Sequence, residues 1–112
     1  MKLAIYPGTF DPITRGHLDM VERAVKTCDR LVVGVAKSTP KNVWFSLEER
    51  VELVRDSTSH LPDVEVQVFE GLLVDFARKV KAGFLIRGVR AFSDFEYELQ
   101  MALINRKLAP DI

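Results

Sequence analysis

The feature that most constrains this chain is the stretch LAIYPGTFDPITRGH, residues 3–17. Its apolar beginning predicts a buried strand over residues 3–6, which Pro7 and Gly8 end. Pro12 and Gly16 then keep the following residues out of regular structure. A helix is expected next, because apolar residues repeat at helical spacing: Leu18, Val21, Ala24, Val25 and Cys28.

A strand, a turn rich in glycine and proline, and a helix start in succession form a site for phosphate. Unpaired backbone N–H groups and the positive end of the helix dipole point out of such a turn. His17 stands at the expected helix start and adds a side-chain donor. Thr9 and Thr14 offer hydroxyl groups, and Gly16 lets a phosphate approach the main chain closely.

The rest of the chain alternates between predicted strands and helices. Residues 30–36 are rich in valine without polar alternation, which is typical of a strand covered on both faces. Strands are also predicted over residues 64–68, nearer an edge, and 84–87. Capping boxes open helices at Ser46 and Ser93, and a short helix is expected between Gly71 and Gly83. This order predicts an α/β fold with a doubly wound parallel sheet.

Ligands of such sheets bind beyond the carboxyl ends of the strands, where the strand order reverses. Four separate stretches bring donors and cations to that edge: Thr9 and Phe10; Lys37, Ser38 and Lys41; Gly71, Leu72 and Leu73; Arg87, Gly88 and Arg90. This set of residues suits a polyphosphate ligand.

Composition and missing motifs exclude several other classes. The 112 residues favour one domain over residues 1–112, and a formal net charge of +0 argues against a nucleic-acid or membrane surface. No P-loop, no G-x-G-x-x-G and no Cys/His metal cluster is found. A single cysteine, no signal peptide and no apolar stretch long enough for a bilayer favour a reduced cytoplasmic setting.

The four residues TRGH, 14–17, resemble the T-x-G-H signature of the nucleotidyltransferase superfamily. A wider match is more specific, and it comprises YPGTFDPITRGH at 6–17, FSLEER at 45–50, GLLVDF at 71–76 and IRGVRAFSDFEYELQM at 86–101. Together these blocks resemble the bacterial phosphopantetheine adenylyltransferases. The resemblance implies a Rossmann-like nucleotidyltransferase fold and adenylyl transfer from ATP to 4′-phosphopantetheine, giving dephospho-coenzyme A and pyrophosphate.

The same resemblance implies roles for single residues. His17 would bind the α-phosphate and stabilise the transition state. Both substrates would touch Thr9, and the other contacts with ATP would come from Phe10, Gly88, Val89, Arg90 and Glu98. Lys41 and Arg87 would hold the phosphate of the acceptor, and Leu73 its pantetheine arm. No side chain is expected to ligate metal directly, and Mg²⁺ would accompany the triphosphate, held mostly by phosphate oxygens and water.

The chain ends earlier than this family does. The family continues with a further strand and a serine-rich segment, I-S-S-[ST]-x-[VL]-[KR], which helps to bind the β- and γ-phosphates of ATP. The resemblance therefore implies an N-terminal portion, truncated after the fourth strand and the following helix, of a protein that forms homo-hexamers when full length. Asn42, Val43 and Trp44 also depart from the family's usual lysine- and proline-containing loop.

Other interpretations remain open at this stage. His17 could be an exposed first-turn residue, Thr14 only a helix cap, and Lys41, Arg87, Arg90 and Glu98 surface charges. We expect Trp44 and Phe45 to act as a hydrophobic staple, and His60 to be a solvated residue at a helix end. The chain as a whole could be a related T-x-G-H enzyme that uses CTP, or a doubly wound binding module without chemistry.

Overall fold

The computed structural model describes residues 2–37 and 43–87, which form four strands and three helices in alternation. In order, the elements are β1 (Leu3–Gly8), α1 (Arg15–Ala24), β2 (Arg30–Ala36), α2 (Leu47–Ser57), β3 (Val64–Phe69), α3 (Leu73–Val80) and β4 (Phe84–Leu85). The expected α/β fold with a doubly wound parallel sheet is confirmed. The helix expected from Ser93 lies outside the described residues.

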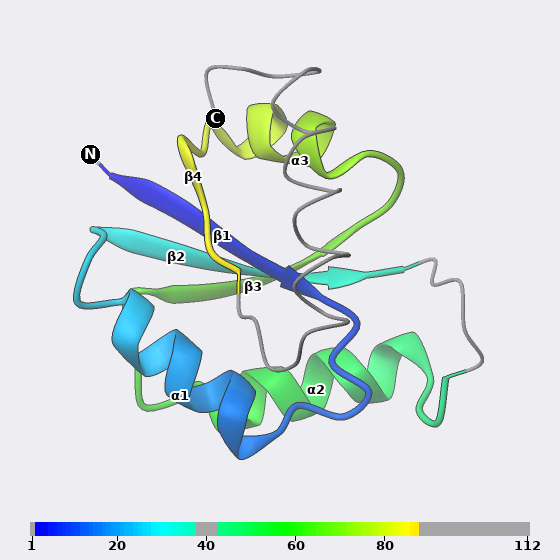
Figure 1. Ribbon diagram of the computed structural model, residues 1–112. Helices are drawn as coiled ribbons and strands as arrows, with labels where there is room; N and C mark the ends of the chain where they lie inside the picture. Colours follow the sequence, from blue (N-terminus) through cyan, green and yellow to red (C-terminus); the bar gives the residue numbers. More distant parts are fainter. Residues whose placement is uncertain (1, 38–42, 88–112) are drawn as a thin grey trace, which may run out of the picture.

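The four strands form one parallel sheet in the order β3-β2-β1-β4 (Figure 1). The chain moves outward from β1 to β3 and then crosses back to add β4 on the other side of β1. The strand order therefore reverses at β1, and a ligand is expected beyond its carboxyl end. As expected, β3 lies at an edge of the sheet.

Alternating residues of the strands divide the interior into two cores. Tyr6 and Val33 face the side that α1 and α2 cover, whereas Ile5 and Val32 face α3. Figure 1 shows α1 and α2 on one face of the sheet and α3 on the other. β2 is buried on both faces, with five consecutive buried residues, which explains its valine-rich sequence.

Local signals set the helix starts. At α2, Ser46 accepts a hydrogen bond from the Glu49 amide at 3.2 Å, and Glu49 accepts one from the Ser46 amide at 3.1 Å. The predicted capping box is confirmed. These bonds hold the pKa of Glu49 below its usual value, so their stabilisation is present at neutral pH and is lost as the pH falls through the folded-state pKa.

Several boundaries differ from the predictions. β1 continues through Pro7 to Gly8, because both residues still pair with β2. Only two residues of the expected strand 84–87 pair as β4. Lys81, with φ of 64°, ends α3 in the left-handed conformation, so Gly83 is not the residue that stops this helix.

Cys28 lies beyond the end of α1 rather than on it. Its thiol donates to the Ala24 carbonyl at 3.2 Å and packs against the first core, and burial is the main cause of its raised pKa.

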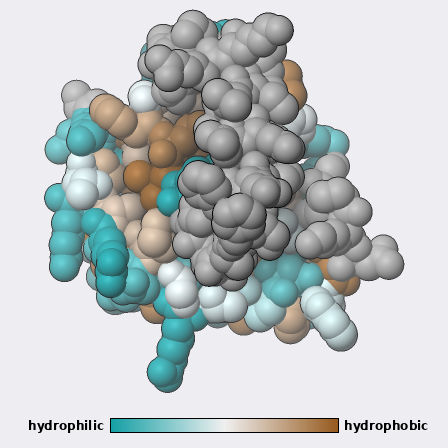
Figure 2. Space-filling model, viewed as in Figure 1, coloured by the Kyte–Doolittle hydropathy of each residue, from teal (hydrophilic) through white to brown (hydrophobic). Residues whose placement is uncertain are grey.

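Apolar side chains are exposed near β4, the edge strand at the other side of the sheet from β3. Figure 2 shows them gathered where β4 runs in Figure 1. Phe84 of β4 is 48% exposed, with the Lys2 ammonium 4.7 Å from its ring centre.

Gly34 gives a direct test of the second core. A Cβ at this position would lie 3.0 Å from Phe76 and 3.2 Å from Phe69, whose rings stack 5.1 Å apart. We therefore expect Gly34→Val to lower the free energy of unfolding by about 1–3 kcal/mol through overpacking. Gly83→Val is the control, because nothing lies within 4 Å of its Cβ position. Denaturant unfolding measures both, and equal losses would contradict this packing.

Candidate phosphate-binding site

The start of α1 is built around a reciprocal pair of hydrogen bonds between Thr14 and His17. The Thr14 hydroxyl accepts from the His17 amide at 3.3 Å, and the Thr14 amide donates to His17 Nδ1 at 3.0 Å. Thr14 is therefore the N-cap, as expected, and the histidine occupies the capping-box position that usually holds Glu or Gln.

This pair defines the tautomer of His17. A nitrogen that accepts from a backbone N–H carries no proton, so the neutral ring has its hydrogen on Nε2. The capping geometry therefore favours the tautomer that carries its hydrogen on Nε2.

Aromatic packing supports the same ring. Phe10 contacts His17 edge-on, with ring centres 5.0 Å apart, and Tyr6 contacts Phe10 at 5.5 Å. A Cβ on Gly8 would lie 3.0 Å from the Phe10 ring, so glycine permits this approach. Phe10 is only 2% exposed and has φ of 52°. Any contact between Phe10 and a ligand would therefore involve its main chain.

Gly16 lies in the first turn of α1. A Cβ there would meet only the Thr14 hydroxyl, at the ordinary contact distance of 3.6 Å. Packing within the described chain thus does not require glycine at this position. A glycine here leaves space beside the first main-chain N–H groups of α1, as close approach of an anion requires.

Asp11 joins this turn to the segment before α2, a role that sequence analysis missed. Its carboxylate accepts from the Phe45 amide at 2.8 Å and from the Trp44 amide. The hydrophobic staple expected of Trp44 is wrong, because its side chain is 88% exposed. The Asp11 carboxylate instead holds this segment by the main-chain amides of Trp44 and Phe45.

Arg50 is a second residue that sequence analysis missed. Its side chain is 2% exposed, and its Nη1 donates to the carbonyls of Thr9 and Ala36, both at 2.9 Å. The sequence did contain a signal, since Arg50 occupies the i+3 position of an apolar stripe formed by Leu47, Val51 and Val54. A charged residue at such a position is expected to have buried polar partners.

Other predicted residues lie around the same edge of the sheet. Lys37 follows β2 and pairs with Glu70 at 3.6 Å, and both line a cavity of about 410 Å³ beside α3. Arg87 follows β4, which pairs with β1. Leu73 begins α3 and is mostly buried, at 9% exposed. The remaining predicted residues, Lys41, Gly88, Val89, Arg90 and Glu98, lie outside the described residues, as does Ser38.

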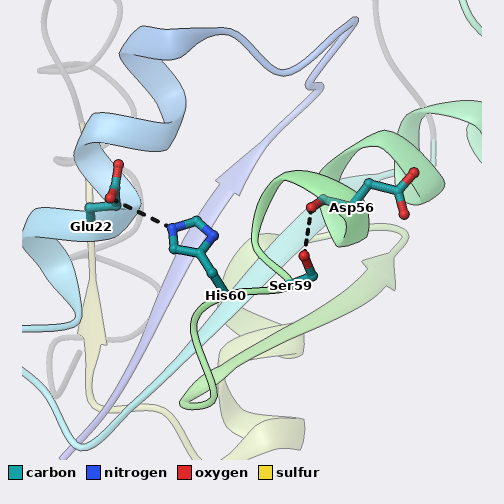
Figure 3. Close-up of polar contacts among 4 residues, drawn as sticks. All are labelled: Glu22, Asp56, Ser59 and His60. Carbon is teal, nitrogen blue, oxygen red and sulfur yellow. Dashed lines mark hydrogen bonds and ion pairs between the residues drawn. The ribbon is translucent and has the colours of Figure 1, made fainter.

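His60 lies away from this site. It follows the end of α2 and is half exposed, and its Nε2 lies 3.6 Å from a Glu22 carboxylate oxygen of α1 (Figure 3). Ser59 beside it donates to the Asp56 carbonyl at 2.9 Å. The solvated position is confirmed, with the addition that His60 connects the two helices on this face of the sheet.

Two searches cover only residues 2–37 and 43–87. No group of three or more His, Cys, Asp or Glu side chains there could hold a metal ion. No helix in these ranges is both long and apolar enough to cross a membrane.

Comparison with known proteins places the chain in context. Residues 5–112 match the sequence profile of the cytidylyltransferase-like family. The chain is 62% identical over all of its 112 residues to a phosphopantetheine adenylyltransferase of Moorella thermoacetica, of which it spans 70%.

Solved structures with low sequence identity share the fold. A lipopolysaccharide core biosynthesis protein from Thermoplasma volcanium matches 93% of this chain and 88% of its own, with a TM-score of 0.65 at 22% identity. A bifunctional NMN adenylyltransferase/ADP ribose pyrophosphatase from Francisella tularensis matches 92% of this chain and 36% of its own, with a TM-score of 0.67 at 15% identity. A structure of that bifunctional enzyme in complex with AMP and a manganese ion is also similar. The match covers 88% of this chain and 41% of the enzyme, with a TM-score of 0.58 and 14% identity.

The tautomer of His17 is directly measurable. We expect the nitrogen chemical shifts of His17 in NMR spectra of the ligand-free protein at neutral pH to show a protonated Nε2 and an unprotonated Nδ1, because the Thr14 amide occupies Nδ1. Spectra of His17→Gln assign the signals, and His60 serves as the exposed internal comparison. A proton on Nδ1 of His17 would contradict the capping geometry.

Proposed function

The chain belongs to the cytidylyltransferase-like family, and we propose that it transfers the adenylyl group of ATP to 4′-phosphopantetheine. The products are dephospho-coenzyme A and pyrophosphate, which places the reaction in coenzyme A synthesis. The observation that carries this proposal is the 62% identity, over the whole chain, to a phosphopantetheine adenylyltransferase. The geometry of the α1 start supports it independently.

The reaction needs no strong base. A phosphate oxygen of the acceptor is already anionic at neutral pH, and it attacks the α-phosphorus of ATP in line with the leaving group. The new P–O bond forms as the bond to the β-phosphate breaks, and pyrophosphate takes that bonding pair. Negative charge develops around the α-phosphate, so catalysis depends on positioning and on hydrogen-bond donors.

His17 supplies such a donor in this proposal. Its Nδ1 accepts from the Thr14 amide, and in this proposal Nε2–H donates to an α-phosphate oxygen. The amides at the start of α1 add further donors and the helix dipole. A neutral donor of this kind stabilises the transition state without transferring a proton.

The other assignments follow the resemblance residue by residue. Thr9 would contact both substrates, and Phe10 would contact ATP through its main chain. Lys41 and Arg87 would hold the acceptor phosphate, with Leu73 beside the pantetheine arm. Gly88, Val89, Arg90 and Glu98 complete the proposed ATP contacts. The structure places Arg87 and Thr9 after adjacent strands, which fits a site that receives both substrates at one sheet edge.

Mg²⁺ is the proposed cofactor. We propose that the ion is bound through phosphate oxygens of the triphosphate and water rather than by a cluster of side chains. When bound, the ion neutralises charge on the triphosphate. His17 and the α1 amides then orient the α-phosphate.

Assembly and location are also proposals. We propose a homo-hexamer for the full-length protein, with small-molecule substrates and no nucleic-acid or membrane partner. The balanced net charge of +0 argues against a nucleic-acid or membrane surface, and the single cysteine supports a cytoplasmic location.

Replacing His17 tests the proposed function. Pyrophosphate release with ATP and 4′-phosphopantetheine is measured for the wild type, His17→Ala and His60→Ala. We expect His17→Ala to lower kcat by roughly 10²–10³-fold, because it removes one donor to the transition state. ATP affinity by calorimetry should change little, whereas the melting temperature should fall modestly, because the ring also accepts the capping hydrogen bond from the Thr14 amide.

His60→Ala is the matched control. This histidine follows the C-terminal end of α2 and pairs with Glu22, away from the start of α1, so its loss should leave kcat unchanged. Near-normal turnover in His17→Ala would reduce His17 to a helix-capping residue. Turnover of CTP in preference to ATP would favour the alternative enzyme class instead.

A further inference from the structure

Arg50 closes the end of the β1–β2 ladder. The last paired residues of these strands are Gly8 and Val35. The next carbonyls, those of Thr9 and Ala36, both accept from Arg50 Nη1 at 2.9 Å. One guanidinium nitrogen from α2 therefore joins two main chains at the point where they leave the sheet.

Burial of this charge is costly. Arg50 is 2% exposed, its Nε has no hydrogen-bond partner, and among the described residues no carboxylate forms an ion pair with it. A well-packed apolar side chain at such a position is often as stable as a buried charge or more so. Global stability alone is thus a weak explanation for an arginine here.

The segments that Arg50 joins both carry residues assigned to the proposed site. Thr9 is followed by Phe10, whose ring packs against His17 at 5.0 Å. Ala36 is followed by Lys37, and Lys41, the proposed acceptor-phosphate residue, comes four residues later in the sequence, outside the described ranges. The carboxylate of Asp11 makes a second connection between the same two segments through the Phe45 amide at 2.8 Å.

We propose that Arg50 is a positioning residue that sets the separation between the ATP half and the acceptor half of the site. This inference rests on the proposed adenylyl transfer. Arg50 touches neither substrate and acts through the carbonyls of Thr9 and Ala36. Each half keeps its own binding contacts, so loss of the bridge misaligns the acceptor oxygen and the α-phosphorus without removing a ligand contact.

The test compares Arg50→Lys and Arg50→Gln with Thr58→Val. Among the described residues, Thr58 is the other buried polar residue, at 4% exposed. It lies at the C-terminal end of α2, where its hydroxyl donates to the Val54 carbonyl at 2.9 Å. Thr58→Val therefore perturbs the same helix away from the site. For each protein, kcat, both KM values and the melting temperature are measured.

We expect both Arg50 variants to lower kcat by about 10–100-fold, because a shift of about 1 Å in alignment has an effect of that order. KM for ATP and for 4′-phosphopantetheine should each change by less than about threefold, because the residues that bind each substrate in the ground state are retained. Arg50→Lys should not rescue kcat, because the lysine Nζ lies one bond closer to the main chain than arginine Nη1 and falls short of both carbonyls.

Destabilisation is separated from misalignment in the same experiment. If an Arg50 variant is partly unfolded, trimethylamine N-oxide is added until its fraction folded matches that of Thr58→Val. A low kcat that persists in the folded variant supports the proposal. Recovery of kcat with folding, full activity of Arg50→Lys, or an equal loss of kcat in Thr58→Val would overturn it.

The wild type separates this proposal from the proposed function. If the wild type does not form dephospho-coenzyme A, the assigned reaction fails, whatever the variants do. If the wild type is active and only the Arg50 prediction fails, the bridge between Thr9 and Ala36 is structural.

Discussion

The parallel pairing of β1 on both sides is the constraint on which the rest of the structure depends. Because β2 and β4 flank it, the chain after β1 leaves the sheet where the strand order reverses. Its next residues must turn at that edge before α1 begins. Beyond Gly8 the turn is held by side chains: the Thr9 carbonyl accepts from Arg50, the Phe10 ring packs against His17, and Thr14 and His17 cap α1.

The polar side chains around this turn form hydrogen bonds to the main chain. Nδ1 of His17 is occupied by the Thr14 amide, Asp11 accepts two amides, and Arg50 donates to two carbonyls. Each of these polar side chains fixes a main-chain segment at the turn where the proposed α-phosphate site lies. This arrangement suits a reaction whose nucleophile is already ionised and whose transition state gathers negative charge.

Local patterns in the sequence predicted the parts of the fold that local interactions decide. The strand–helix order, the Thr14 cap and the Ser46–Glu49 capping box follow from spacing and side-chain chemistry. The carbonyl partners of Arg50 and the amide partners of Asp11 could not be predicted, because they depend on where two neighbouring strands end in space. The exposure of Trp44 depends likewise on a loop held by a distant carboxylate. The roles of all the predicted site residues, His17 and Arg87 included, stay predictions.

The central claim is that the acceptor phosphate attacks the α-phosphorus of ATP. The most direct measurement supplies ATP and 4′-phosphopantetheine carrying heavy oxygen in its phosphate group, with products analysed by mass spectrometry. We expect the label to be retained entirely in dephospho-coenzyme A, because the acceptor oxygen becomes the bridge, and the pyrophosphate to be unlabelled. Label in the pyrophosphate, or no labelled dephospho-coenzyme A at all, would contradict the account.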